Sequence, residues 1–243
     1  MNKKRILITG ASRGIGEAIA KKLAKEGFDL FLVCSSSMDR LNIIKNEIVD
    51  SYHVDCQILK CDVSSYDEVK KCAREVLRFD DLYAVINNAA ISYIGLMTDM
   101  SVDEWKKIMD VNLNSIFYFS HELAPYMVNN KEGKIINISS MWGQVGASME
   151  VAYSTAKGGV DAFTKALAKE LAPSNVQVNA VSFGVIDTDM NKCFSKEEMD
   201  ALVMEIPSDR LGTVEEASEM VLKILESPKY LTGQIIRMDG GLI

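Results

Sequence analysis

Tyr153 and Lys157 are the two side chains best suited to moving a proton. They stand four positions apart in a segment with helical periodicity, so both lie on one face of a helix, about one turn apart. A free phenol has a pKa of about 10 and is a poor acid or base at neutral pH, but a neighbouring ammonium stabilises the phenolate and lowers that pKa. The pair is suited to protonating a carbonyl oxygen as a hydride arrives, although ordinary amphipathic helices show the same spacing.

Two hydroxyl side chains, Ser139 and Ser140, follow the apolar run at residues 134–138, which is typical of a buried strand. Open α/β sheets bind ligands at the carboxyl ends of their strands, where a serine can hold a substrate oxygen. Turn formation or helix capping would explain the same two residues. Ser140 is the candidate for the oxygen-binding group.

A glycine-rich turn, T-G-A-S-R-G-I-G, runs from Thr9 to Gly16 between an apolar run and a helical segment. Glycines allow positive φ and close approach of the backbone to a pyrophosphate, and the amides that begin the next helix favour negative charge. The spacing G-x-x-x-G-x-G departs from the commoner G-x-G-x-x-G, and a tight turn without a ligand would also use glycines. Alone, this turn is weak evidence for a dinucleotide site.

The tip of the second expected strand carries Ser35 and no acidic residue. An acid there would bind the adenosine ribose and repel a 2′-phosphate, whereas Asp39 comes later, where capping of the next helix explains it. Arg13 in the glycine turn can pair with a phosphate, and Ser35 can hydrogen-bond to it. We therefore expect NADP(H) rather than NAD(H) as the cofactor.

Short apolar runs alternate with amphipathic segments, which predicts buried parallel strands joined by helices. The expected strands are residues 5–9, 29–33, 57–59, 83–87, 134–138, 177–181 and 234–237, and the expected helices are residues 15–26, 38–50, 66–77, 102–129, 152–171 and 214–226. Right-handed crossovers then give a single α/β domain over residues 1–243, a doubly wound Rossmann fold on a seven-stranded parallel sheet with helices on both faces. Residues 191–210 interrupt this rhythm and are expected to form a substrate lid.

The composition disfavours several classes of protein. A formal net charge of −7 over 243 residues disfavours nucleic acid or an anionic membrane as the main partner. Five scattered cysteines and only two histidines predict reduced thiols and no metal site. Because the apolar runs are too short for a signal peptide or a membrane span, we expect a cytoplasmic protein.

These motifs, taken in order, resemble the short-chain dehydrogenase/reductase family. They are TGxxxGIG at Thr9–Gly16, Asp62-Val63 after the third strand, Asn87-Asn88-Ala89 after the fourth, Asn112 in the long helix, Ser140, and Tyr153-x-x-x-Lys157. The match covers essentially the whole chain, and the motifs together are highly specific.

The resemblance implies a catalytic tetrad of Asn112, Ser140, Tyr153 and Lys157. Tyr153 would be the general acid in reduction and the base in oxidation, Ser140 would polarise and orient the carbonyl, and Asn112 would hold a water in a proton relay. Lys157 would also bind the nicotinamide ribose. The cofactor-binding residues implied, besides Tyr153 and Lys157, are Gly10, Ser12, Arg13, Gly14, Ile15 and Gly16 in the turn, Ser35, Asp62 and Val63 at the adenosine end, and Asn88, Ala89, Gly184, Ile186 and Thr188 at the ribose and nicotinamide end.

Two positions depart from the family's pattern. Ala90 stands where a glycine is common, and Phe183 stands before Gly184 where a proline is common. The methyl group of Ala90 is tolerable at negative φ, whereas Phe183 frees a restricted φ and adds a bulky ring near the nicotinamide. The departure puts the shape of that loop in question, not the chemistry.

Within the family, the chain looks like bacterial 3-oxoacyl-[acyl-carrier-protein] reductases in its length, its glycine turn and its carboxyl-terminal Asp239-Gly240-Gly241. That likeness implies a homotetramer and a role in fatty-acid elongation. Carrier proteins are acidic, so docking needs basic residues beside the active-site mouth. Lys131 and Lys134 stand where family members offer one basic contact, but residues 173–175 lack the second.

Residues 140–151 also resemble the reductases that finish the aminopentanone modification on elongation factor P. Glu150 can attract the ammonium of such a substrate and Trp142 can stack on it, although a surface acid and a packing indole are also ordinary there. An alcohol or hydroxysteroid dehydrogenase and a non-catalytic NADP-binding redox sensor remain further alternatives. The complete tetrad argues against a sensor, and the missing acid after the second strand argues against an oxidative enzyme.

Overall fold

The computed structural model describes residues 4–190 and 194–243. Within them, seven parallel strands form one sheet in the order β3-β2-β1-β4-β5-β6-β7. Their bounds are β1 Arg5–Thr9, β2 Asp29–Cys34, β3 Cys56–Lys60, β4 Leu82–Asn87, β5 Gly133–Ser140, β6 Val176–Phe183 and β7 Ile235–Met238. This is the doubly wound Rossmann topology that the alternation of segments predicts, with the reversal of strand order between β1 and β4.

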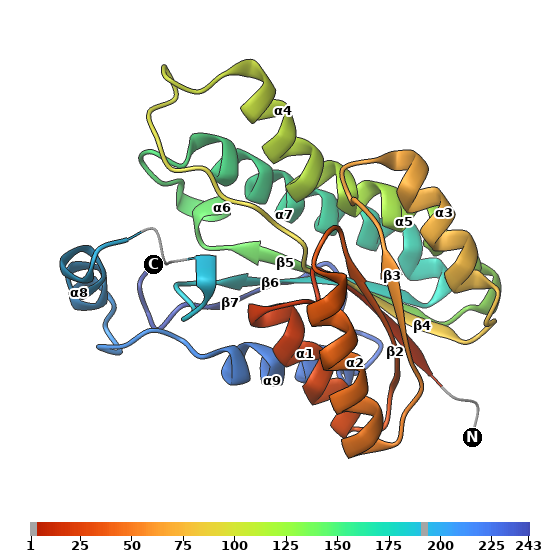
Figure 1. The fold of residues 1–243 in the computed structure, drawn as a ribbon. Helices are drawn as coiled ribbons and strands as arrows, with labels where there is room; N and C mark the ends of the chain where they lie inside the picture. The colour runs from red at the N-terminus through yellow and green to blue at the C-terminus, as the bar shows by residue number, and fades with distance from the viewer. Residues whose placement is uncertain (1–3, 191–193) are drawn as a thin grey trace.

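Helices cover both faces of the sheet (Figure 1). One face carries α1 (Gly14–Lys25), α2 (Met38–Tyr52) and α9 (Val214–Leu225), and the other carries α3 (Tyr66–Leu77), α5 (Ser115–Asn130) and α7 (Val151–Leu171). The shorter helical elements among the described residues are α4 (Val102–Met109), η1 (Asp110–Asn114), α6 (Trp142–Val145), η2 (Ala172–Ser174) and α8 (Lys196–Glu205). Every residue of β1, β2, β5 and β6 is buried, as expected for strands packed on both faces.

The long helix expected over residues 102–129 is interrupted, so that prediction is wrong in one respect. A π-helical turn, η1 (Asp110–Asn114), separates α4 from α5. Such a turn inserts one residue into the helical repeat and often marks a functional site. The apolar pattern did not reveal it, because buried residues continue on both sides of the insertion, with Ile108 before it and Ile116 after it. The π turn carries Asn112.

The segment expected to be a lid is partly helical. Residues 191–193, which include Cys193, lie outside the described residues, and α8 begins after them with a reciprocal capping box between Ser195 and Glu198. The other four cysteines are free and buried. Among the described residues, no three His, Cys, Asp or Glu side chains are grouped to hold a metal ion. None of the described helices combines the length and the apolar character needed to cross a bilayer.

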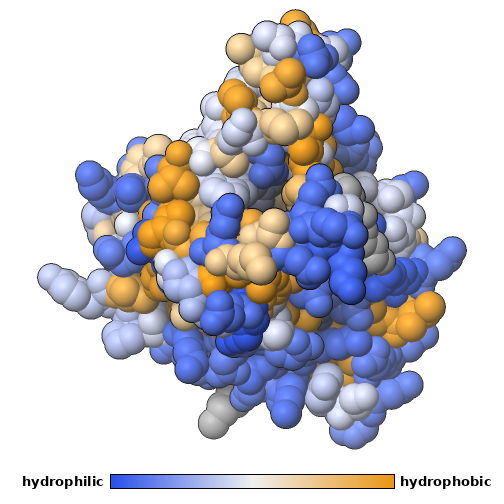
Figure 2. Space-filling view, turned by 90° about the vertical axis from the view of Figure 1, so that its left-hand side faces the viewer, coloured by the Kyte–Doolittle hydropathy of each residue, from blue (hydrophilic) through white to orange (hydrophobic). Residues whose placement is uncertain are grey.

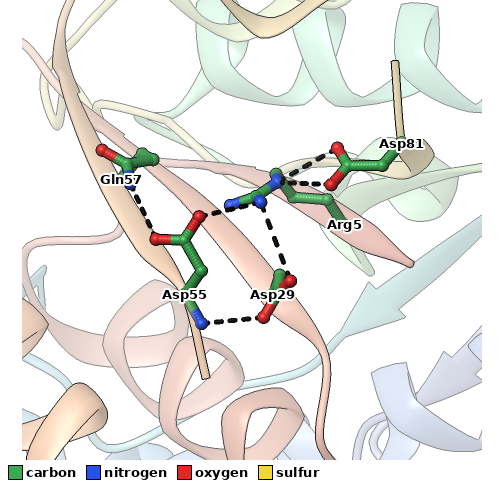
Figure 3. Close-up of polar contacts among 5 residues, drawn as sticks. All are labelled: Arg5, Asp29, Asp55, Gln57 and Asp81. Carbon is green, nitrogen blue, oxygen red and sulfur yellow. Dashed lines mark hydrogen bonds and ion pairs between the residues drawn. The ribbon is translucent and has the colours of Figure 1, made fainter. Parts of the chain in front are cut away.

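A buried arginine closes the amino-terminal edge of the sheet (Figure 3). Arg5 forms ion pairs with Asp55 at 2.9 Å, with Asp81 at 3.1 Å and with Asp29 at 3.7 Å. Asp29 begins β2, and Asp55 and Asp81 immediately precede β3 and β4. One guanidinium therefore links the first four strands at the edge opposite the cleft described next.

Candidate active site

A cleft of about 1210 Å³ opens at the carboxyl ends of the strands. Its lining runs from the glycine turn past β5 and α7 to α8. Figure 2 shows this side of the molecule, where apolar side chains gather around a hollow below the projecting lobe that contains α4. The cleft contains all the predicted site residues except Asn112: Gly10, Ser12, Arg13, Gly14, Ile15, Gly16, Ser35, Asp62, Val63, Asn88, Ala89, Ser140, Tyr153, Lys157, Gly184, Ile186 and Thr188.

The glycine turn has the geometry of an anion cradle. Gly10 and Gly14 have φ values of +66° and +57°, and a Cβ at Gly16 would collide with the carbonyl oxygen of Gly10. Arg13 at the N-cap of α1 makes no side-chain capping bond, so the helix presents its first amides to the cleft. A turn this tight leaves room for a phosphate where side chains would otherwise stand.

Side-chain hydrogen bonds of Asn88 and Thr9 join that turn to the end of β4. The Asn88 amide donates to the carbonyl oxygens of Thr9 at 2.9 Å and Gly10 at 3.2 Å. The Thr9 hydroxyl accepts from the backbone amides of Asn88 and Ala89, each at 3.0 Å. The sequence predicted only a cofactor contact for Asn88. The structure gives its side chain a second role, which is to hold the turn against β4.

The adenosine end of the cleft carries hydroxyls and a positive charge. Ser35, Ser36 and Ser37 line it, and Arg13 is exposed across from them on the glycine turn. Asp62 accepts from the backbone amide and the hydroxyl of Ser64, at 3.0 and 2.7 Å, which fixes the loop after β3. The tip of β2 therefore presents hydroxyl donors and no carboxylate to the cleft.

The side chains predicted to be catalytic come together on the opposite wall. Ser140, at the end of β5, hydrogen-bonds to the half-buried Tyr153 of α7. Lys157 lies one turn further along α7, 2 % exposed, with its Nζ 5.5 Å from the centre of the Tyr153 ring. That ammonium donates to the carbonyl oxygen of Ile138 at 2.7 Å. The helix and the strand thus bring the predicted phenol, hydroxyl and ammonium into one group.

The direction expected for the Tyr153 pKa is wrong for this arrangement. Burial raises the pKa of Tyr153 to about 12, the charge of Glu150 adds to the rise, and the bond from Ser140 opposes it. Burial also lowers the pKa of Lys157 to about 8, against the opposing effect of Asp161. The expectation considered only the nearby ammonium, whereas the loss of solvation around the phenolate dominates here.

Asn112 does not line the cleft. Its fully buried side chain accepts from the backbone amide of Ile91 at 2.9 Å and donates to the Ile91 carbonyl oxygen at 2.8 Å. These two bonds leave one N–H and one oxygen lone pair of the amide unused. In the observed arrangement, Asn112 fixes the segment that follows β4 to the π turn.

Asp161 is a site residue that sequence reasoning missed. It follows Lys157 by one helical turn, is buried, and accepts a bond from the Ser139 hydroxyl at 2.5 Å. Burial raises its pKa, and the Ser139 bond opposes that rise. The sequence does contain a signal for it, because a residue four positions after Lys157 lies on the same face of the helix. The group therefore contains a carboxylate that supports the positive charge of Lys157.

The loop containing Phe183 and Gly184 is well defined despite its departure from the family pattern. Phe183 is buried in the core, and its carbonyl oxygen accepts from the amide of Met141 at 2.9 Å. Gly184 donates to the carbonyl oxygen of Met238 at 2.9 Å, and a Cβ there would lie 2.7 Å from the Cα of Asp239. A proline would restrict φ at this position, whereas here the packing of the phenyl ring in the core holds the backbone in place.

The prediction that Lys131 and Lys134 offer a basic docking contact beside the active-site mouth is wrong. Lys134 is 5 % exposed and donates to the carbonyl oxygens of Ser227 at 2.8 Å and Ile224 at 3.4 Å. Burial lowers its pKa. Both Lys131 and Lys134 stand at the amino end of β5, opposite the cleft, because parallel strands place all their carboxyl ends at the other edge.

Glu150 and Trp142 both line the substrate side of the cleft. Glu150 directly precedes α7, and burial raises the pKa of its carboxyl group. Trp142 begins α6, directly after the β5 strand and Met141. The two residues singled out by the loop sequence therefore share the space beside Tyr153.

Comparison with known proteins agrees with this geometry. The sequence profile described as short chain dehydrogenase matches residues 4–199. The chain is 37 % identical over 239 residues to the uncharacterized oxidoreductase YmfI of Bacillus subtilis, covering 98 % of both chains. It is 37 % identical over 238 residues to the 3-oxoacyl-[acyl-carrier-protein] reductase FabG of Aquifex aeolicus, covering 97 % of this chain and 96 % of that protein. The FabG of Staphylococcus aureus strain N315 is 36 % identical over 241 residues, with 98 % of each chain covered. The chain belongs to the short-chain dehydrogenase/reductase family of oxidoreductases.

Proposed function

We propose that this chain is an NADPH-dependent ketone reductase in which Tyr153 is the proton donor. The observation that carries the proposal is the contact of Tyr153 with Ser140, together with the Lys157 ammonium 5.5 Å from the centre of the Tyr153 ring, inside the cleft beside the glycine turn. Family membership supports the same chemistry at a carbonyl or alcohol carbon.

The residues that would hold NADPH fall into three groups along the cleft. The glycine turn would bind the pyrophosphate with Gly10, Ser12, Gly14, Ile15 and Gly16, and Arg13 with Ser35 would bind the 2′-phosphate. The adenine would lie against Asp62 and Val63. The remaining contacts would come from Asn88, Ala89, Tyr153, Lys157, Gly184, Ile186 and Thr188. Once bound, the nicotinamide supplies the hydride.

The environment of Tyr153 suits the reductive direction. With its pKa raised to about 12, Tyr153 is fully protonated at neutral pH and is the acid form that reduction needs. An alkoxide forming on the substrate is a much stronger base than a phenolate, so proton transfer from Tyr153 is downhill. Ser140 would orient the carbonyl oxygen toward that proton, and Lys157 would stabilise the phenolate that remains.

Two substrates are candidates. The first is a 3-oxoacyl thioester on acyl carrier protein, because several relatives carry that name. The second is the aminopentanone on elongation factor P, and the presence of Glu150 and Trp142 in the substrate part of the cleft favours it. The buried position of Lys134 removes a basic contact that the first candidate needs.

The test of the proposal is the consumption of NADPH, with NADH in parallel, against acetoacetyl-carrier protein, a small acetoacetyl thioester and a simple ketone. Turnover of at least one of them, faster with NADPH than with NADH, is expected. Fast turnover of the carrier-bound form would select the first substrate. NADPH binding without turnover of any carbonyl compound would contradict the proposed reductase.

A further inference from the structure

A second pocket, of about 640 Å³, lies between α6, α7 and the start of β7. It shares no lining residue with the cleft that contains Tyr153 and Lys157. Two of its lining glycines, Gly143 and Gly158, bring α6 close to α7, because a Cβ at Gly143 would lie 2.6 Å from the carbonyl carbon of Lys157. The second pocket therefore borders the backbone next to Lys157 without being part of the cleft.

Asp161 connects the second pocket with the cleft. It is 7 % exposed and lines the second pocket, whereas Ser139, whose hydroxyl donates to its Oδ1 at 2.5 Å, lines the cleft. No hydrogen bond or ion pair joins the other oxygen, Oδ2, to any of the described residues. A carboxylate oxygen held largely out of water without a partner is costly, because nothing replaces its lost hydration. A partner for Oδ2 can arrive through the second pocket.

Lys165 brings the opposite charge to the same pocket. It is exposed and follows Asp161 by one helical turn. Burial raises the pKa of Asp161, and the charge of Lys165 opposes that rise. Even so, no ion pair joins the two side chains, and Lys165 has no other partner in the part of the chain that the structure describes. The pocket thus presents a carboxylate and an ammonium group that are not paired with each other.

The charges of this pocket select the kind of ligand that it fits. Asp161 and Lys165 are its two charged residues among those described, and the other polar side chains are the carboxamides of Gln144 and Gln234. A ligand with only a positive charge is repelled by Lys165, and a ligand with only a negative charge is repelled by Asp161. A ligand that carries both charges pairs with both residues.

The charge of Asp161 matters to Lys157 because the other groups around that ammonium are neutral. Burial lowers the pKa of Lys157 to about 8, and the Asp161 carboxylate opposes this change. The ring of Tyr153 lies 5.5 Å from the ammonium, the carbonyl oxygen of Ile138 accepts from it, and Ser139 contributes a hydroxyl nearby on β5. A ligand that pairs with Asp161 would therefore act on Lys157 without entering the cleft.

We infer that the second pocket binds a small zwitterion of the amino-acid type, its ammonium group on Asp161 and its carboxylate on Lys165, and that this ligand weakens the support that Asp161 gives to Lys157. The bound ammonium group would offset the negative charge of Asp161, so Lys157 would lose its proton at a lower pH. The effect on turnover rests on the reductase proposed above, whereas the binding itself does not.

Calorimetric titration with L-alanine tests the binding. Two analogues of similar shape lack one charge each: 2-methylpropanoate lacks the ammonium group, and 3-methylbutan-2-amine lacks the carboxylate. We expect L-alanine to bind at least about threefold more tightly than either analogue, as one ion pair with a partly exposed partner provides. Lys165→Met should remove the advantage of L-alanine over the amine. The control is Lys169→Met, which removes an exposed charge one turn further along α7, outside the lining of the pocket, and should keep that advantage.

Turnover of a ketone by the wild-type protein tests the coupling to Lys157. Saturating L-alanine should lower kcat/KM about twofold at about pH 8 and leave it unchanged at about pH 6, where Lys157 stays protonated. No binding of L-alanine, an advantage over the amine that survives Lys165→Met, or binding without the change at about pH 8 would each overturn the inference while the reductase stands. If no carbonyl compound consumed NADPH, the proposed reductase would fall, and with it the coupling to turnover, while calorimetry would still decide whether the pocket binds the zwitterion.

Discussion

Two opposing influences set the pKa of Lys157. Its burial lowers its pKa to about 8, and Asp161, bonded to Ser139, opposes that change. A neutral lysine cannot stabilise the phenolate that Tyr153 becomes when it gives up its proton. We therefore expect the pH range of the proposed reduction to depend on the Asp161 carboxylate, which would act as a positioning residue because it supports the charge of Lys157.

Asp161→Asn tests that role. The amide oxygen can still accept from Ser139, so the packing is kept while the negative charge is lost. Without that charge the pKa of Lys157 falls further below about 8, so the loss of kcat/KM for reduction with rising pH should begin at a lower pH. A pH profile of the variant checks this. An unchanged profile with lower activity at all pH values would indicate a purely structural role.

At the residue level, the sequence predicted which side chains would lie together at the end of β5 and on α7. Ser140, Tyr153 and Lys157 lie together as their motifs imply. The pKa directions were not predictable, because burial depends on all the elements that surround a group. Nor could the sequence reveal that the Asn112 amide is engaged by the Ile91 backbone.

At the level of elements, tight packing between turns and strands positions the site. The glycine turn is pressed against β4 through Asn88, and α1 follows it directly. Hydrophobic periodicity predicted the seven strands and six long helical segments because each buries a regular face. It could not predict the π turn, or the four-residue α6, since one inserted residue or a single helical turn leaves no period to detect.

Gly16→Ala tests the packing of the glycine turn. The added methyl group would meet the Gly10 carbonyl and lie 2.6 Å from the Asn88 amide nitrogen, so the turn must open. We expect NADPH affinity to fall by at least about tenfold, because the cradle would lose its shape. Titration of the folded variant with NADPH, followed by fluorescence or calorimetry, measures this loss.

Gly27→Ala is the matched control. Gly27 also has positive φ, +87°, but a Cβ there meets no atom within 4 Å. It should cost about 1 kcal/mol of the free energy of unfolding through backbone strain and leave NADPH affinity unchanged. Equal losses of affinity in both variants would show that the glycine turn has no special role.

At the level of the whole molecule, stability and chemistry are placed at opposite edges of the sheet. The carboxyl ends of the strands form the cleft, while Arg5 links Asp29, Asp55 and Asp81 at the amino ends (Figure 3). The order of the strands follows from alternating helices and right-handed crossovers, so it was predictable. The Arg5 cluster was not, because its partners lie far apart in the sequence.

Arg5→Met should destabilise the protein without changing its chemistry. Three carboxylates would lose their shared cation in a partly buried place, which costs about 3–5 kcal/mol of the free energy of unfolding. Denaturant unfolding measures the loss, and kcat/KM of the folded variant should match the wild type. Lys4→Met is the control, since the exposed pair of Lys4 with Glu132 contributes about 1 kcal/mol or less. Similar losses in the two variants would contradict the role given to Arg5.

Replacement of Tyr153 by phenylalanine tests the central claim most directly. The phenyl ring keeps the shape of the cleft wall but has no proton to donate, so NADPH consumption with a ketone should fall by about 100-fold or more. NADPH should still bind, since the glycine turn and Lys157 are untouched. Turnover close to that of the wild type, with NADPH binding intact, would show that Tyr153 is not the proton donor and would contradict this account.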